Sequence, residues 1–135
     1  EEEGPFDGIL GFSQGATLAA IFMLLSTPTA ATPPPFRCAI LVSGFIPRDA
    51  SLLGLIESRA ASQPPISLPT LHVMGENDTF VSTQATLALA TSFANPSYFT
   101  HPGGHGIPSN AEFRKSITDF LAKVGEQTVT AGLTA

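Results

Sequence analysis

Residues 38–42 form an unbroken apolar run, Cys-Ala-Ile-Leu-Val, and this run constrains the fold more than any other feature of the sequence. A strand with one face in water alternates apolar and polar side chains, whereas a strand buried on both faces is apolar throughout. Residues 67–74 lead into a similar stretch, Thr-Leu-His-Val-Met. Such strands belong to parallel sheets whose two faces are covered by helices, so we expect an α/β fold.

The segments around these runs predict an alternation of strands and helices. Residues 14–26 are rich in Ala, Leu and Met, which are good helix formers, and they are apolar on nearly every side. Residues 26–36 are rich in Pro, Thr and Ala and predict an exposed loop. The expected elements are strands at 6–12, 38–42, 67–74 and 97–100, and helices at 14–26, near 51–60, at 82–94 and from 108 onward.

The last helix carries its own start and stop signals. Ser109 and Glu112 match a capping box, and Gly125 is a plausible C-cap. Apolar residues recur at helical spacing between these two signals, at Phe113, Ile117, Phe120, Leu121 and Val124. We therefore expect one partial domain over residues 1–125, with a mostly parallel sheet covered by helices, and a flexible tail over 126–135.

Composition argues against several classes of function. The net charge is −5 and the 6 Lys and Arg residues form no basic cluster larger than a pair, so we expect no nucleic-acid binding. The longest apolar runs, such as Leu18–Leu25, fall well short of the about 20 residues that cross a membrane, so we expect no membrane span. The single cysteine, Cys38, can form neither an internal disulfide nor a zinc site by itself. This fits a reducing compartment, and we expect a cytoplasmic protein.

The sequence Gly11-Phe12-Ser13-Gln14-Gly15 fits the pattern G-x-S-x-G between an expected strand and an expected helix. That context is typical of a nucleophile elbow. Small residues must flank the serine in so tight a turn, and Gly11 and Gly15 supply them. The turn would raise the Ser13 hydroxyl above the sheet, and the backbone N–H of Gln14 would stabilise an oxyanion. The alternatives are a glycine-rich structural turn and a phosphate-binding turn.

An acidic turn, Gly-Glu-Asn-Asp at 75–78, directly follows the third expected strand. An acid at the carboxyl end of a strand is well placed to orient a histidine. The candidates are Glu76, Asp78 and Asp49, and we choose Asp78 because it ends the turn before the chain becomes apolar again. The alternative is a solvated turn residue, since Asn and Asp are common in turns.

The sequence His-Pro-Gly-Gly-His at 101–105 lies between the fourth expected strand and the last helix. The glycines around His105 leave the loop free to bring its imidazole to the serine, so His105 is the expected general base. His101 is the competitor, or it positions the loop. Two histidines four residues apart in such a loop share no helical face, so we expect no metal and no cofactor. His72 lies within a strand and is expected in the core.

The chain order Ser13, Asp78, His105 is the nucleophile–acid–histidine order of α/β-hydrolases. Ser13 would attack an acyl carbonyl while His105 takes its proton, and Asp78 would hold the imidazole tautomer. Water would then release the acyl group from the enzyme. A flavodoxin-like binding domain would explain the alternation of elements, but it would leave the three motifs without a role.

Residues 44–65 interrupt the alternation directly after a strand, where α/β sheets place ligand pockets. Four apolar residues there are candidate pocket residues: Phe45, Ile46, Leu52 and Leu53. Ordinary core packing is the alternative. The low charge of this segment favours an uncharged acyl group, presented as an ester or thioester on a small molecule or a carrier.

Three segments together resemble the group called the family of serine hydrolases, small α/β-hydrolases common in fungi and related to the human ovarian-cancer-associated esterase. These segments are GPFDGILGFSQGA, LPTLHVMGENDTFVS and HPGGHGIPS, and the resemblance spans residues 4–124. It implies an esterase or thioesterase with its triad on Ser13, Asp78 and His105, in agreement with the choice made from the residues.

The position of the elbow departs from that family, whose serine lies near the middle of a longer chain. The resemblance implies that this chain is the C-terminal part, without the first strands and without the loop that supplies a second oxyanion donor. The strand at 6–12 would then expose an apolar edge that can pair with another chain, for example in a dimer. A catalytically weak fragment, acting as an interaction module or needing the other half, is the alternative function.

Overall fold

Four parallel strands form the centre of the protein, in a computed structural model that describes residues 4, 6–26 and 36–133. The strands are β1 (Gly8–Phe12), β2 (Cys38–Val42), β3 (Thr70–Gly75) and β4 (Pro96–His101), and they pair in chain order. All four carboxyl ends therefore meet at the same edge of the sheet. Most of the loop expected at 26–36 lies outside the described residues.

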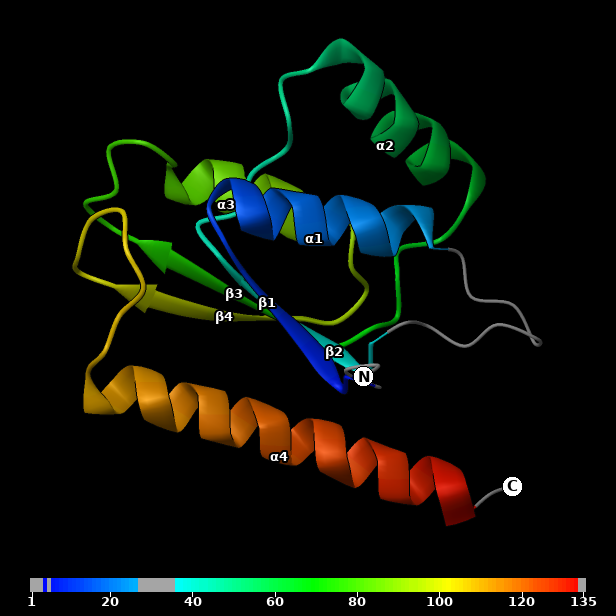
Figure 1. The fold of residues 1–135 in the computed structure, drawn as a ribbon, viewed down its shortest axis with the longest axis vertical. Helices are drawn as coiled ribbons and strands as arrows, with labels where there is room; N and C mark the ends of the chain where they lie inside the picture. Colours follow the sequence, from blue (N-terminus) through cyan, green and yellow to red (C-terminus); the bar gives the residue numbers. More distant parts are fainter. Residues whose placement is uncertain (1–3, 5, 27–35, 134–135) are drawn as a thin grey trace.

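Helices cover both faces of this sheet, as the apolar run at 38–42 predicts (Figure 1). The helices α1 (Gln14–Leu25) and α3 (Thr83–Ala90) lie on one face, and α4 (Ala111–Leu133) lies on the other. The helix α2 (Ala50–Ser62) packs on the outer side of α1. The expected α/β fold class is confirmed: helices cover both faces of a parallel sheet.

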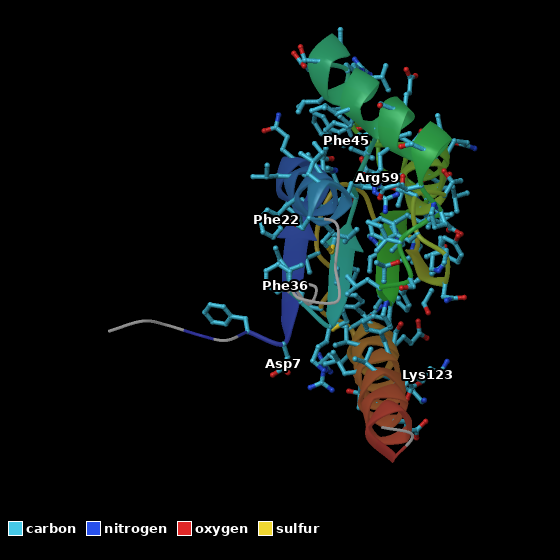
Figure 2. All side chains as sticks on the ribbon, turned by 90° about the vertical axis from the view of Figure 1, so that its right-hand side faces the viewer. Asp7, Phe22, Phe36, Phe45, Arg59 and Lys123 are labelled. Carbon is cyan, nitrogen blue, oxygen red and sulfur yellow. The ribbon has the colours of Figure 1, made fainter. Side chains whose placement is uncertain are left out.

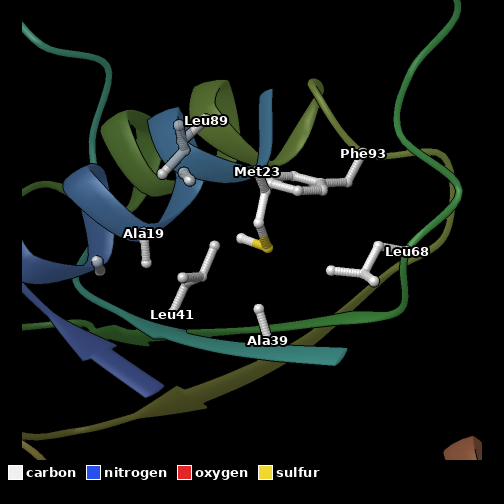
Figure 3. Packing of buried hydrophobic residues seen from close by; sticks show 9 residues of the cluster. Ala19, Met23, Ala39, Leu41, Leu68, Leu89 and Phe93 are labelled. Carbon is white, nitrogen blue, oxygen red and sulfur yellow. The ribbon is translucent and has the colours of Figure 1, made fainter. Parts of the chain in front are cut away.

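The strand β2 contributes to two separate cores because successive side chains point to opposite faces. Ala39 and Leu41 face α1, where Met23 lies among Leu68 and Phe93 (Figure 3). The other three residues of β2 face α4 and pack with its apolar stripe: Cys38, Ile40 and Val42 against Phe113, Phe120 and Val124. Packing on both faces fixes the position of the strand. The carboxyl ends of the strands, which the polar residues of the candidate site follow, are therefore held in place.

The end signals predicted for the last helix were wrong. Asn110 is the N-cap, because its Oδ1 accepts a 2.8 Å hydrogen bond from the Phe113 N–H, so Ser109 and Glu112 form no capping box. The helix also runs through Gly125 to Leu133, across the segment expected as a flexible tail. A glycine within a helix costs only about 1 kcal/mol relative to alanine, and no proline follows to end the helix.

The helix expected at 82–94 ends early, at Ala90. Beyond it, the N–H groups of Ser92 and Phe93 donate to the carbonyls of Leu89 and Ala90 in tight turns. These turns carry Phe93 into the core, where its backbone bridges Ile66. Burial of the Phe93 ring thus takes precedence over helix propensity in this segment.

The strand β1 lies at an edge of the sheet in the described part of the chain. Leu10 on this strand is 53% exposed, and the side chains of Leu18 and Phe22 on α1, on the other face of the sheet, are also exposed. Figure 2 shows Phe22 and Phe36 along this open side of the molecule, with their ring centroids 6.1 Å apart. An apolar edge of this kind is suited to pairing with further polypeptide.

In the described residues, no helix is long and apolar enough to cross a membrane.

His72 lies within β3 and is fully buried, as the sequence predicts. Its Nε2 lies 3.0 Å from Thr70 Oγ1, while its Nδ1 has no hydrogen-bond partner among the described residues. Burial lowers the pKa of His72 from 6.5 to about 4, because the charged imidazolium is poorly solvated in the core. The native protein therefore keeps this ring neutral in mildly acidic solution.

We expect the free energy of unfolding to fall as the pH drops from about 6.5 to about 4, because only the unfolded chain protonates His72 in that interval. The loss should reach about 3 kcal/mol. Urea denaturation at about pH 7 and about pH 4.5 measures it, with His72→Leu as the comparison. The substituted protein should lose much less stability on acidification, and equal losses in the two proteins would contradict this role of His72.

Candidate active site

Ser13 occupies a strained turn between β1 and α1. Its φ of 55° and ψ of −121° lie outside the regions that residues with a Cβ prefer. Its N–H donates to the Val42 carbonyl at 2.8 Å, and its own carbonyl accepts from the Thr17 N–H at 3.1 Å. These bonds hold the residue between the sheet and the first turn of α1, with its side chain at the carboxyl edge of the sheet.

The two glycines of the G-x-S-x-G motif differ in their surroundings. A Cβ at Gly11 would lie 2.6 Å from the Ala16 Cα and 2.6 Å from the Gly15 carbonyl oxygen, so no side chain fits there. A Cβ at Gly15 would meet nothing within 4 Å. The close approach of β1 to α1 therefore requires Gly11, whereas the packing of the described residues does not require Gly15.

Three side chains from distant parts of the sequence meet at this edge. His105 Nε2 lies 2.9 Å from Ser13 Oγ, and His105 Nδ1 lies 2.8 Å from Asp78 Oδ2. Ser13 follows β1, Asp78 follows β3 and His105 follows β4. The sequence-predicted nucleophile, acid and base thus lie in one hydrogen-bonded row.

The Asp78 carboxylate is fully buried and has four hydrogen-bond donors around it. Its Oδ1 accepts from the N–H groups of Phe80 at 2.9 Å and Val81 at 2.8 Å. Its Oδ2 accepts from His105 and from the Ser43 hydroxyl at 3.0 Å. Burial raises the pKa of this carboxyl, but the hydrogen bonds from Val81, His105, Phe80 and Ser43 outweigh it, so the pKa of Asp78 falls below its usual value.

The competing acids and the competing histidine lie elsewhere. Asp49 caps α2 by accepting from the N–H groups at Ser51 and Leu52. Glu76 is exposed, and its N–H donates to the His101 carbonyl at 2.8 Å. His101 is buried at the end of β4, where its Nδ1 accepts from the Gly103 N–H at 3.2 Å. His101 therefore shapes the loop that presents His105.

The acidic turn and the histidine loop approach each other through Gly75. A Cβ at this position would lie 2.6 Å from the Gly103 carbonyl oxygen. Asn77 joins the same two segments, because its Nδ2 donates to the Pro102 carbonyl at 2.7 Å and its N–H donates to the Gly103 carbonyl at 3.1 Å. This backbone packing holds Asp78 and His105 at a fixed separation.

Two aromatic rings lie close to the His105 imidazole. The ring of Phe12 lies 4.9 Å from the imidazole centroid, and the ring of Phe80 lies 5.3 Å from it. Phe80 is 82% exposed and also lines a cavity of about 350 Å³. The full lining of this cavity is Phe45, Ile46, Arg48, Phe80, Val81 and Ala85. Phe80 thus contacts both the His105 imidazole and an open, largely apolar space.

Two of the four predicted pocket residues line this cavity, Phe45 and Ile46. Leu52 instead packs against the core residues Ile21, Leu24 and Ile56, and Leu53 is not part of the cavity wall. Helix geometry explains the difference, because α2 turns Leu52 toward α1.

Sequence reasoning missed Ser43, Phe12 and Phe80. Ser43 offered a signal, since it is a polar residue directly after a strand, as Ser13 is. Phe12 offered a weaker one, because it sits beside Ser13 within the motif. The sequence holds no signal for Phe80, because its contact with the imidazole depends on where folding places His105. Within the described residues, no three His, Cys, Asp or Glu side chains are grouped so that they could hold a metal ion.

The profile of one protein family, described as serine hydrolase (FSH1), matches residues 1–117 of this chain. The chain belongs to this family. Esterase OVCA2 from Bos taurus is 47% identical over 118 residues, which are 87% of this chain and 50% of that protein. The human esterase OVCA2 is 44% identical over 123 residues, 91% of this chain and 52% of that protein. This FSH1-family chain therefore spans about half the length of the curated relatives it matches.

Solved structures agree on the fold. Atu2452 from Agrobacterium tumefaciens, a protein of unknown function, has a TM-score of 0.59 at 27% identity, covering 86% of this chain and 51% of that one. Acyl-protein thioesterase 2 from Zea mays has a TM-score of 0.57 at 23% identity, covering 91% of this chain and 58% of that one. These similarities place the FSH1-family chain among α/β-hydrolase folds.

The two motif glycines should respond differently to alanine. We expect Gly11→Ala to lose about 2 kcal/mol or more of stability, because its Cβ would collide with backbone atoms that have no room to move. Gly15→Ala should be neutral or gain up to about 1 kcal/mol, since alanine favours the helix. Chemical denaturation of both variants measures the difference. Similar losses for the two would show that the turn is not packed as described.

Proposed function

We propose that this chain carries the catalytic triad of a serine hydrolase, and that it cleaves carboxylic esters or thioesters through an acyl-enzyme. The row of hydrogen bonds from Ser13 Oγ through His105 to Asp78 is the observation that supports this most. Membership in a serine hydrolase family supports the same reaction class, and so does the similarity to relatives named as esterases.

Each residue takes one role in this reaction. His105 Nε2 accepts the Ser13 hydroxyl proton as Oγ attacks the acyl carbonyl, and it then returns the proton to the leaving alcohol or thiol. Asp78 keeps the other ring nitrogen protonated and stabilises the imidazolium. Water attacks the acyl-enzyme by the same route in reverse and releases the acid.

The backbone N–H of Gln14 is our candidate for stabilising the oxyanion. It lies in the first turn of α1, where N–H groups have no partner within the helix and the helix dipole favours negative charge. In α/β-hydrolases a second donor comes from a loop after an earlier strand. We propose that this second donor lies in the half of the relatives' length that this chain does not span.

The cavity lined by Phe80, whose ring also lies against His105, suits an apolar acyl group. Phe45, Ile46, Phe80 and Val81 contribute apolar walls, with Arg48 as the only charged residue in the lining. We propose that the acyl chain of an ester or thioester lies here, on a small molecule or on a carrier.

A second candidate is a catalytically weak module that needs another polypeptide. It is favoured by the open edge of β1 together with the half-length match to the curated relatives. In this case further polypeptide, or a second copy of this chain, would pair with β1. The two candidates differ in whether Ser13 is reactive in the chain as it stands.

Ser13 should form a single covalent adduct with a fluorophosphonate, because His105 is placed to activate its hydroxyl. Intact mass spectrometry detects the adduct, and Ser13→Ala should abolish it together with ester hydrolysis. Ser116→Ala on α4, on the opposite face of the sheet, is the matched control and should label normally. An adduct that persists in Ser13→Ala would refute the assignment. No adduct on the folded wild-type chain would favour the second candidate.

The exposed Phe80 ring should matter for long acyl chains. Burying about 40 Å² of apolar surface against it would contribute about 1 kcal/mol. Phe80→Ala should therefore raise KM several-fold for octanoyl esters and leave KM for acetyl esters nearly unchanged. Leu87→Ala, an exposed leucine on α3 that does not line the cavity, is the control. Equal effects of Phe80→Ala on the two esters would remove the basis for an acyl site here.

A further inference from the structure

Ser43 has no step in the reaction above, yet its side chain touches the triad. Its Oγ donates to Asp78 Oδ2 at 3.0 Å, and the same oxygen faces His105 Nδ1 at 2.8 Å. Ser43 is 1% exposed, so water does not compete for this bond. A hydroxyl and an imidazole N–H thus share one oxygen of a buried carboxylate.

The backbone of Ser43 also has an unusual conformation. Its φ is 50°, and Ser13 is the other non-glycine residue with a positive φ in the described part of the chain. This left-handed conformation is unfavourable for a residue with a Cβ. The Ser43 N–H donates to the Val73 carbonyl at 2.8 Å, which ties the strained residue to β3. Strain of this kind persists where the surroundings hold it, and it is common at functional sites.

Ser43 completes the set of donors around the carboxylate. Phe80 and Val81 hold Oδ1 through their N–H groups, at 2.9 and 2.8 Å. Without Ser43, His105 would be the one hydrogen-bond donor to Oδ2 among the described residues. The imidazole would then have to orient the carboxylate that is meant to orient it. The Ser43 hydroxyl supplies an independent anchor from β2.

We propose that Ser43 is a positioning residue, which fixes the Asp78 carboxylate so that Oδ2 faces His105 and the imidazole stays aligned with Ser13. This inference rests on the proposed function of the triad. It assigns Ser43 no contact with substrate, so its removal should affect the chemical steps and leave binding of the acyl group unchanged.

Two substitutions separate the hydroxyl from the backbone strain. Ser43→Ala and Ser43→Gly both remove the hydroxyl, but glycine adopts a φ of 50° without strain. We expect both variants to lose about tenfold in kcat with KM unchanged, while Ser43→Gly melts at a higher temperature than Ser43→Ala. Ser43→Thr, which restores a hydroxyl, should recover part of kcat.

Thr86→Val is the matched control. Thr86 is also 1% exposed, and its Oγ1 donates to the Gly44 carbonyl at 2.9 Å, one residue from Ser43. Valine removes this buried hydroxyl without touching Asp78, so it should lower the melting temperature and leave kcat unchanged. The proposal is overturned if kcat simply follows the melting temperature across all these variants.

A spectroscopic measurement tests the proposal without turnover. The His105 Nδ1–H resonance, observed by NMR on ¹⁵N-labelled protein, should exchange faster with solvent in Ser43→Ala and be unchanged in Thr86→Val. If the chain hydrolyses no ester, the proposed function fails. The exchange rate of this resonance would still show whether Ser43 holds the Asp78–His105 pair in place. Equal exchange in wild type and Ser43→Ala would overturn the positioning role.

Discussion

The buried carboxylate of Asp78 is the interaction on which the arrangement of the site depends. A charge without solvent must be neutralised by neighbouring donors, and here the donors come from different parts of the fold. Its own turn after β3 gives two N–H groups, β2 gives the Ser43 hydroxyl, and the loop after β4 gives His105. His105 in turn reaches Ser13 after β1. The carboxyl ends of all four strands are therefore joined through one residue.

The backbone around Ser13, Asp78 and His105 and the walls of the cavity obey different constraints. Gly11 and Gly75 lie where backbone segments approach so closely that a Cβ would stand 2.6 Å from its neighbours. These contacts position Ser13, Asp78 and His105 and tolerate little change in volume. Phe80 and Arg48, in contrast, are exposed side chains on loops. Under the proposed function, substitutions at the cavity would change substrate preference and leave the arrangement of Ser13, Asp78 and His105 unchanged.

The sequence predicted those features whose cause is local. The run at 38–42 predicted a strand buried on both faces, and the G-x-S-x-G pattern predicted the turn at Ser13. Asp78 was chosen over Glu76 from its place in the turn, and the structure brings Asp78 to His105. Ser43 and Phe80 escaped notice because their partners lie far away in the sequence. The N-cap of α4 was missed by one residue, since Ser109 and Asn110 are both good caps and the folded chain uses Asn110.

The separation of the triad residues along the chain bears on how the protein folds. The strands pair in chain order, so each can add to the sheet soon after the one before it. The hydrogen bond between Ser13 and His105 joins residues 92 positions apart, and that between Ser43 and Asp78 joins residues 35 apart. Contacts this distant carry a large loop-closure entropy and form late. During synthesis, Ser13 therefore emerges long before His105, and the two side chains meet only when the last strand has joined the sheet.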